Sequence, residues 1–158
     1  MGFRKFEVDD KQFTIKITRV GPLAARMAQI AFYRITDYVG PCQYTKIITK
    51  TGDAHRQVFR ILSEVVNWSV SWILRNKTFA RTYIVISELE SSRVNIYEKY
   101  VSTKAEFINH KYVRGEFQDS AGTSKAVFII YDPDYLKNNP IYNEILNKAL
   151  NDSFKISL

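Results

Sequence analysis

The side chains best suited to chemistry are few and far apart in this sequence of 158 residues. His55 and His110 each lack a second ligand at metal-binding spacing, and the place of His55 at the start of a predicted helix favours a surface role. Cys42 is the only cysteine, so one chain can form neither an internal disulfide nor a cysteine-based metal cluster. The Asp-Pro-Asp sequence at 132–134 is more typical of a turn than of a metal site. We therefore predict no catalytic residue, no metal and no cofactor.

The sequence also lacks the known loop motifs of catalytic sites. Residues 122–125, Gly-Thr-Ser-Lys, lack the glycine frame that binds phosphate in nucleotide-binding loops. The sequence contains neither a nucleophile elbow nor a zincin motif. Acidic residues that are distant in sequence can still meet in space, but no pattern indicates it. The sequence therefore favours a protein that is not an enzyme.

Composition is that of a single globular domain, with 46% apolar and 25% charged residues. The formal net charge is +7, and the basic residues are scattered in ones and twos, as on a solvated surface. The start of the chain has no apolar run after its basic residues, and no segment approaches the ~20 apolar residues of a membrane helix. We expect a protein made in the cytoplasm, with no membrane partner.

The first forty residues predict a hairpin followed by an ambiguous segment. Alternating residues at 6–8 and 13–17 predict two strands joined by a turn at 9–12. Helix formers after Pro22 predict a short helix at 23–30. The β-branched and aromatic residues at 30–39 then predict a strand. One continuous helix over 23–38 is the alternative.

A long helix follows a glycine turn at 39–41 and a short strand at 44–50. Asp53 is a plausible N-cap, and apolar residues recur at helical spacing up to about residue 74. The two tryptophans extend this aliphatic stripe rather than interrupt a basic one, which predicts a buried ridge. The predicted core residues of this helix are Val58, Leu62, Val65, Trp68 and Trp72.

From residue 81 onward the pattern favours antiparallel sheet. Strands are predicted at 83–87, 94–101, 112–117 and 126–131, with a hairpin loop at 119–123. Asp132-Pro133 should end the last strand, and a C-terminal helix should begin at Asn139-Pro140. The predicted fold class is α+β, an antiparallel β-barrel or sandwich with one long flanking helix and a C-terminal helix. We divide it into a β domain with an inserted helix at 1–135 and a C-terminal helical extension at 136–158.

This order of elements resembles the tail tube proteins of contractile-tailed bacteriophages. The resemblance rests on Gly40, the strand at 44–50, Asp53, Trp68 and the Tyr-Asp-Pro-Asp-Tyr close at 131–135. It covers roughly residues 6–135, as a pattern of order and spacing rather than a strict signature. Pro133 interrupts the usual close, and the helix after it is additional to the family pattern.

The resemblance implies a virion tail protein, a subunit of a hexameric ring that stacks into a tube or forms a related tail or neck ring. Its partners would be copies of itself, other tail proteins and DNA that passes through the lumen without tight binding. Because lumenal cations would hold phosphates, the excess positive charge should face outward or lie between rings. Aromatic residues of the predicted sheet are the candidate subunit contacts: Phe32, Tyr33, Tyr38, Tyr97 and Tyr131.

Two alternatives belong to other classes of protein. One continuous helix over 23–38 after the hairpin is similar to the start of some phage tail assembly chaperones. An aromatic sheet face with basic neighbours would instead bind single-stranded nucleic acid by stacking. That face would comprise Tyr97, Tyr100, Tyr112 and Phe117, with Lys99, Lys104 and Arg114 as candidate DNA contacts.

Overall fold

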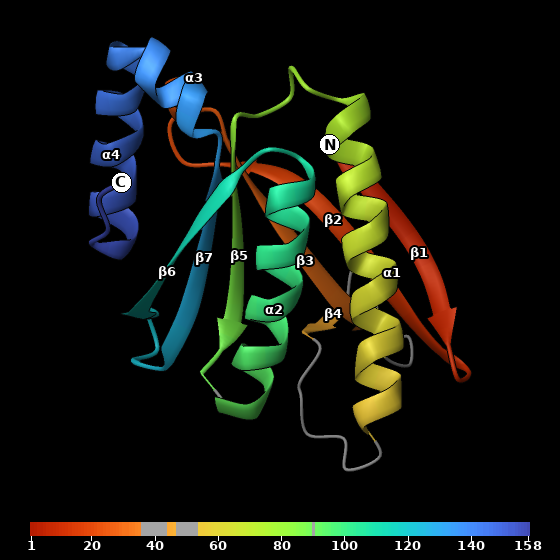
Figure 1. Ribbon diagram of the computed structural model, residues 1–158. Helices are drawn as coiled ribbons and strands as arrows, with labels where there is room; N and C mark the ends of the chain where they lie inside the picture. Colours follow the sequence, from red (N-terminus) through yellow and green to blue (C-terminus); the bar gives the residue numbers. More distant parts are fainter. Residues whose placement is uncertain (36–43, 47–53, 90) are drawn as a thin grey trace.

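The computed structural model describes residues 1–35, 44–46, 54–89 and 91–158 and has the α+β class (Figure 1). The strands are β1 (Gly2–Val8), β2 (Lys11–Val20), β3 (Met27–Ile35), β4 (Tyr44–Lys46), β5 (Thr82–Glu88), β6 (Lys111–Gln118) and β7 (Ser124–Tyr131). The helices are the 3-10 turn η1 (Leu23–Ala25), α1 (Ala54–Arg75), α2 (Ser91–Phe107), α3 (Pro133–Asn138) and α4 (Pro140–Phe154). The turn at 39–41, Cys42 and Asp53 lie outside the described residues.

All described strands belong to one sheet in the order β1-β2-β3-β5-β7-β6, with β4 paired to β3. Neighbours are antiparallel except β3 and β5, which run parallel. The sheet path ends at β1 on one side and at β6 on the other, so the sheet is open (Figure 1). The predicted α+β class with a sandwich-like packing of layers is confirmed, whereas closure into a barrel is wrong.

The strand predicted at 94–101 is wrong, because these residues lie in α2. The strands β5 and β6 flank β7 and point the same way, and parallel strands need a crossover of a dozen or more residues rather than a hairpin. The helix α2 supplies this crossover. Its buried residues recur at helical spacing: Val94, Tyr97, Ala105 and, one residue past the helix, Ile108. This spacing outweighs the sheet preference of valine and tyrosine.

The helices α1 and α2 cover one face of the sheet (Figure 1). Alternate residues of β2, Phe13, Ile15 and Ile17, are buried on this face. Ile61 and Val65 of α1 pack on the first two of them, and Ile73 on the third. No helix among the described residues is both long and apolar enough to cross a bilayer. The apolar face of α1 is instead buried in the protein core.

The C-terminal helix α4 packs on the opposite face of the sheet. Leu146 and Leu150 are fully buried there, in one cluster with Ile84 of β5 and Val127 and Ile129 of β7. The hydroxyl of Tyr142 donates to the carbonyl oxygen of Ala25 at 2.8 Å. Residues beyond 135 therefore share a core with the strands at the centre of the sheet.

Several predicted turns appear where the sequence placed them. Asp9 and Asp10 both adopt positive φ in the two-residue turn between β1 and β2. Asp119 organises the β6–β7 loop, where the backbone N–H of Thr123, donating to its carboxylate at 2.9 Å, lowers the pKa of Asp119. The strand β7 ends at Tyr131, before Asp132-Pro133. Asp132 also caps the unpredicted helix α3 by accepting from the N–H of Asp134 at 3.1 Å.

The segment at 22–38 differs from the prediction in extent. Only residues 23–25 form a helical turn, and β3 already begins at Met27. Arg26, between them, has a left-handed backbone with φ of 48°. The continuous helix on which the assembly-chaperone alternative rests is therefore wrong, since β3 occupies those residues.

Tyr83 lies at the centre of the sheet, 1% exposed, and its hydroxyl has no hydrogen-bond partner among the described residues. Burial raises the pKa of Tyr83 from 10.0 to about 12, partly opposed by the charge of Arg81. The pKa of Tyr83 is higher in the folded than in the unfolded state, so the neutral side chain stabilises the fold. This stabilisation is fully present below pH 10 and is lost as the pH rises toward 12.

We expect Tyr83→Phe to raise stability slightly at neutral pH, because it removes a buried hydroxyl that has no partner among the described residues. Above pH 10 the wild type should lose about 1.4 kcal/mol per pH unit more than the variant. Urea unfolding of both proteins on either side of that pH measures the difference. Equal losses in the two proteins would show that Tyr83 ionises as freely in the folded chain as in the unfolded one.

Candidate functional site

The first edge of the sheet is the outer side of β1. The strand closes on β2 through a two-residue turn, so the flanking pair Val8 and Lys11 exchanges both backbone hydrogen bonds. Alternation then directs the backbone groups of Val8 and every second residue before it toward β2. The groups of Phe3, Lys5 and Glu7 point away from the sheet. This edge therefore presents a row of N–H and C=O groups that no described strand pairs.

The second edge is the outer side of β6. The N–H of Asp119 donates to the carbonyl oxygen of Thr123 at 2.9 Å, which fixes the alternation along the β6–β7 hairpin. Phe117, Gly115 and Val113 bond to β7, with Lys125, Val127 and Ile129 as their partners in register. The backbone groups of the residues between them point outward: Tyr112, Arg114, Glu116 and Gln118.

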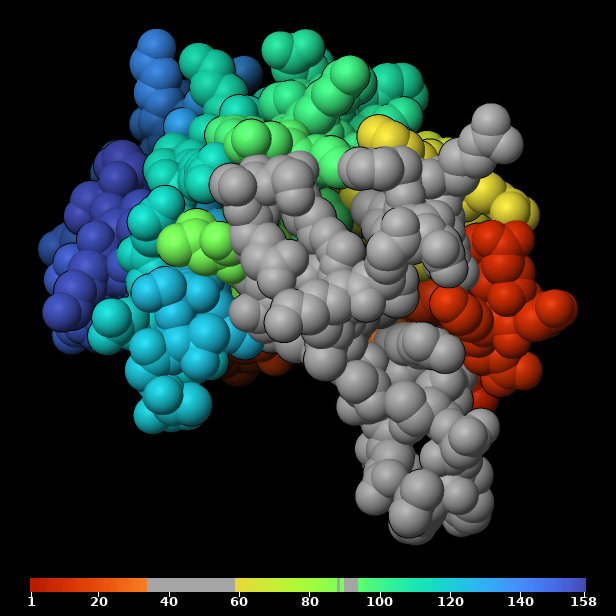
Figure 2. Space-filling view, turned by 90° about the horizontal axis from the view of Figure 1, so that it is seen from below, coloured from red at the N-terminus to blue at the C-terminus, as the bar shows by residue number. Residues whose placement is uncertain are grey.

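The two edges have the same direction. The sheet pairings reverse direction between β1 and β2, between β2 and β3, between β5 and β7 and between β7 and β6, but not between β3 and β5. Consequently β1 and β6 run parallel within one subunit. Figure 2 shows them at opposite sides of the molecule, β1 in red and the β6–β7 region in cyan. A chain with this geometry can offer β6 to β1 of a second copy as a parallel neighbour.

The side chains along both edges carry mixed charges. Arg4 of β1 lies 3.3 Å from Glu64 of α1, and both side chains are nearly half exposed. Arg114 of β6 contacts Glu98 of α2 at 3.1 Å and Glu116 of its own strand at 3.8 Å. These contacts lie on the helix-covered face of the sheet. They leave Glu116, with 60% of its side chain exposed, as an acidic group at the β6 edge.

The aromatic residues predicted to join subunits lie mostly inside the subunit. Tyr97, on α2, is 8% exposed, and its ring packs edge-on against Phe32 at 6.2 Å. Tyr131, at the end of β7, packs against the core under α4. Tyr33 is half-buried in β3, and Tyr38 lies outside the described residues. The structure thus makes Tyr97 a core residue, because it lies on a crossover helix instead of a sheet edge.

The residues of α1 that were predicted to form a buried ridge differ in how deeply they are buried. Leu62 and Val65 are buried, each 4% exposed. Trp68 and Trp72 are half-buried, with ring centroids 6.4 Å apart, and Trp72 packs against Phe79 at 5.0 Å. The side chain of Val58 lies outside the description.

The basic residues predicted to contact DNA do not share one sheet face. Lys99 and Lys104 lie on α2, whereas Arg114 lies on β6. Tyr97 and Tyr100 are also helical, and Phe117 faces the opposite side of the sheet, where it packs on Phe154 at 5.0 Å. The predicted aromatic sheet face is therefore wrong, because half of its members belong to α2.

The carboxylate of Glu98 further reduces the positive charge around Arg114. Its carboxylate accepts from Arg114 at 3.1 Å and from the hydroxyl of Tyr112 at 3.3 Å. Burial raises the pKa of Tyr112, and the negative charge of Glu98 adds to the shift. Arg114 is thus bound within the subunit by an acidic partner.

We expect the protein to bind short DNA weakly at physiological salt, because scattered cations neutralise few phosphates at once. A fluorescence titration with a labelled oligonucleotide measures this at two salt concentrations. A dedicated DNA binder with six or more phosphate contacts would lose on the order of a thousandfold in affinity between about 50 and 200 mM salt. A submicromolar complex with that slope, abolished by neutralising Lys99, Lys104 and Arg114 together, would contradict the expectation.

The remaining polar candidates stay apart. The Nδ1 atom of His110 lies 2.8 Å from the carbonyl oxygen of Ile108, and the side chain of His55 lies outside the description. Among the residues whose side chains are described, no three histidine, cysteine, aspartate or glutamate side chains are grouped so as to hold a metal ion.

The candidate site that sequence reasoning missed is the pair of outer strands. Both strands were predicted, at 6–8 and 112–117, but strand order is a long-range property. The only local signals were the short hairpins at 9–10 and 119–123, which fix the alternation of backbone groups along each outer strand.

A scan against protein-family models and a search of curated proteins give no match to this chain. The class of protein is therefore defined by the fold alone. Its described residues form an α+β protein with one open mixed sheet, two crossover helices on one face and a C-terminal helix on the other.

Proposed function

We propose that this chain is a structural subunit that associates head to tail through its outer strands, as in a bacteriophage tail tube ring or a related tail ring. The observation that carries the proposal is the geometry of the two edges. The strands β1 and β6 have similar lengths, seven and eight residues, and point the same way. An edge strand with unpaired backbone groups is a ready template for another strand.

The shared direction favours one mode of association. When β6 of one copy meets β1 of the next, the sheet continues in parallel, and each copy uses one edge of each kind. Such a heterologous contact repeats from copy to copy and gives a ring when the rotation closes. Pairing of β6 with a second β6 about a twofold axis would instead be antiparallel and would stop at a dimer.

Side chains on the two edges are compatible with the parallel mode. Alternation places Arg4 and Phe6 of β1 on the helix-covered face, as it does Arg114 and Glu116 of β6. One register sets Glu116 beside Arg4 of the next copy, which joins opposite charges across the contact. The same register sets Phe3, 43% exposed, beside Gly115, over which the side chain of Ile156 packs, so that the ring would meet an apolar neighbour there. Association would thus bury an exposed aromatic ring.

Negative-stain electron microscopy of the purified protein tests the proposal directly. We expect closed rings, or short stacks of rings, of uniform diameter. Dispersed particles of single-subunit size at every concentration would refute it. Particles of dimer size would refute the head-to-tail mode and favour the twofold pairing of β6.

A further inference from the structure

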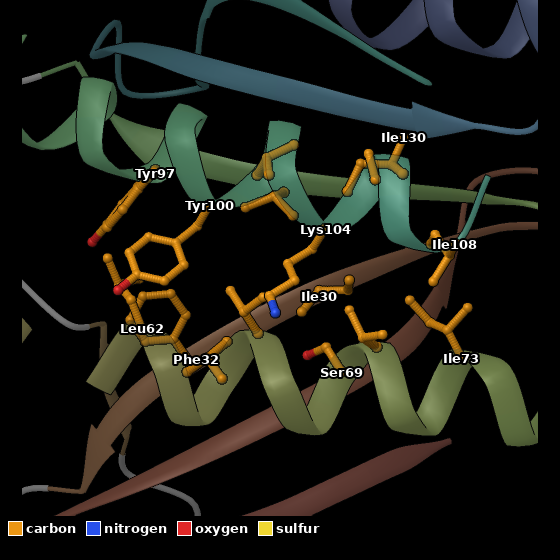
Figure 3. A pocket seen from close by; sticks show the side chains of 16 residues that line it. Ile30, Phe32, Leu62, Ser69, Ile73, Tyr97, Tyr100, Lys104, Ile108 and Ile130 are labelled. Atoms are coloured by element: carbon orange, nitrogen blue, oxygen red, sulfur yellow. The ribbon is translucent and has the colours of Figure 1, made fainter. Parts of the chain in front are cut away.

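A partly enclosed cavity lies between α1 and α2, above the centre of the sheet (Figure 3). Its volume is about 70 Å³, and its walls are almost entirely aliphatic and aromatic. The walls include Leu62, Val66 and Val70 of α1, Val101 of α2, and Ile30 and Ile130 of the sheet. An apolar lining of this kind accepts small apolar molecules or groups.

Two polar groups interrupt this apolar lining. Ser69 of α1 is 4% exposed and lines the cavity, and its hydroxyl has no hydrogen-bond partner in the part of the chain that the structure describes. A buried hydroxyl without a partner destabilises the fold, and a ligand that accepts from it would remove that cost. Lys104 of α2 lines the same cavity, and in Figure 3 its side chain extends from α2 toward α1, with its amine in the space between the helices.

The Lys104 ammonium has no carboxylate partner within the described part of the chain. The ion pairs found there join Arg4 with Glu64, Arg60 with Asp9, Arg114 with two glutamates, and Lys125 with Asp119. The amine of Lys104 lies 5.9 Å from the centre of the Phe107 ring. A cation at the mouth of an apolar cavity, with a buried donor nearby, is suited to an anion that carries an apolar chain.

We propose that this cavity binds a short-chain aliphatic carboxylate. One carboxylate oxygen accepts from the Lys104 ammonium and the other from the Ser69 hydroxyl, while the hydrocarbon chain occupies the space between α1 and α2. A cavity of about 150 Å³ holds the six carbons of benzene, so about 70 Å³ encloses roughly two or three methylene groups. The remaining carbons lie at the mouth. A carboxylate suits the site better than a phosphate, because a single cation faces it.

Hexanoate is the probe that tests the proposal, followed by the chemical shifts of backbone amides in the ¹⁵N-labelled protein. We expect saturable shifts along α1 and α2 near Ser69 and Lys104, at concentrations up to about 10 mM, above the millimolar Kd expected for so small a ligand. Hexan-1-ol, which lacks the charge, should bind at least tenfold more weakly. Hexylamine, which carries the opposite charge, should not bind there.

Three variants test the contributions of the ammonium, the hydroxyl and the cavity to binding one at a time. Lys104→Met keeps the length of the side chain and should weaken hexanoate at least tenfold while leaving hexan-1-ol unchanged. Ser69→Ala should weaken hexanoate severalfold and raise the thermal midpoint, because it removes an unpartnered hydroxyl. Val66→Phe should fill the cavity and abolish binding of both ligands.

Two results would overturn the proposal. The first is the absence of saturable shifts in the wild type at these concentrations. The second is hexanoate binding that is unchanged by Lys104→Met or by Val66→Phe. Neither result bears on the association of subunits, because the cavity residues lie away from both sheet edges.

Discussion

The variant Glu116→Pro is expected to abolish association of subunits while the chain still folds. Proline has no backbone N–H, and at this position the lost N–H points outward rather than toward β7. The β6–β7 ladder therefore keeps its hydrogen bonds, whereas a neighbouring strand meets a missing donor and a bulky ring. Analytical ultracentrifugation should show the wild type as an assembly and the variant as a monomer.

The matched control is Glu116→Ala, which removes the same side chain but keeps the N–H. It should still assemble, with a reduced affinity if the Arg4 contact forms. Thermal unfolding of both variants should confirm that the subunit stays folded. Assembly of Glu116→Pro at the wild-type level would show that β6 is not the contact strand.

The second large expected effect is a loss of folding stability when a buried side chain of α4 is shortened. Leu146→Ala is expected to lower the free energy of unfolding by about 2–5 kcal/mol, the range for a buried leucine replaced by alanine. Leu146 is fully buried in the cluster that joins α4 to β5 and β7. The helix therefore acts as part of the core, and the loss should appear in urea unfolding of the whole chain.

Ile141→Ala provides the matched control on the same helix, since Ile141 is 75% exposed. We expect a change within about 0.5 kcal/mol, typical of a surface substitution. If both variants lose the same stability, the loss does not come from the burial of Leu146, and helix propensity cannot cause it either, because alanine is the best helix former. If neither loses stability, α4 is not required for the core.

Local sequence signals predicted the parts of the fold that depend on neighbouring residues. The turn at Asp9 and Asp10, the long helix and the C-terminal helix after Pro140 each follow from patterns of a few residues. Each pattern is local because turns, caps and amphipathic faces involve residues close in sequence. These elements also set much of the core, since Leu62 and Val65 are buried as their spacing predicts.

Elements that depend on the order of strands were not predictable in this way. The segment 94–101 is rich in valine, isoleucine and tyrosine, which favour strands when they are counted without regard to position. It is a helix because the chain must cross from β5 to β6 around β7. The same long-range order decides that β1 and β6 are the edges. The proposed assembly site could therefore be identified only from the strand order of the sheet.

The structure departs at two places from the order of elements on which the resemblance to tail tube proteins rests. The helix α2 interrupts the predicted ladder after β5, and the close at 131–135 is a strand end followed by the capped start of α3. What continues to support a ring-forming subunit is the pair of codirectional edges. The cavity between α1 and α2 is a separate matter, since it lies on the covered face of the sheet.

Light scattering coupled to size-exclusion chromatography tests the central claim, head-to-tail association through β1 and β6, most directly. The chain has a mass of 18.4 kDa, so the molar mass across the peak gives the number of copies. We predict a single assembly larger than a dimer, with the same number of copies over a broad range of concentration, because a closed ring leaves no edge unpaired. A mass of 18.4 kDa at every concentration, or a dimer that does not grow, would contradict the account.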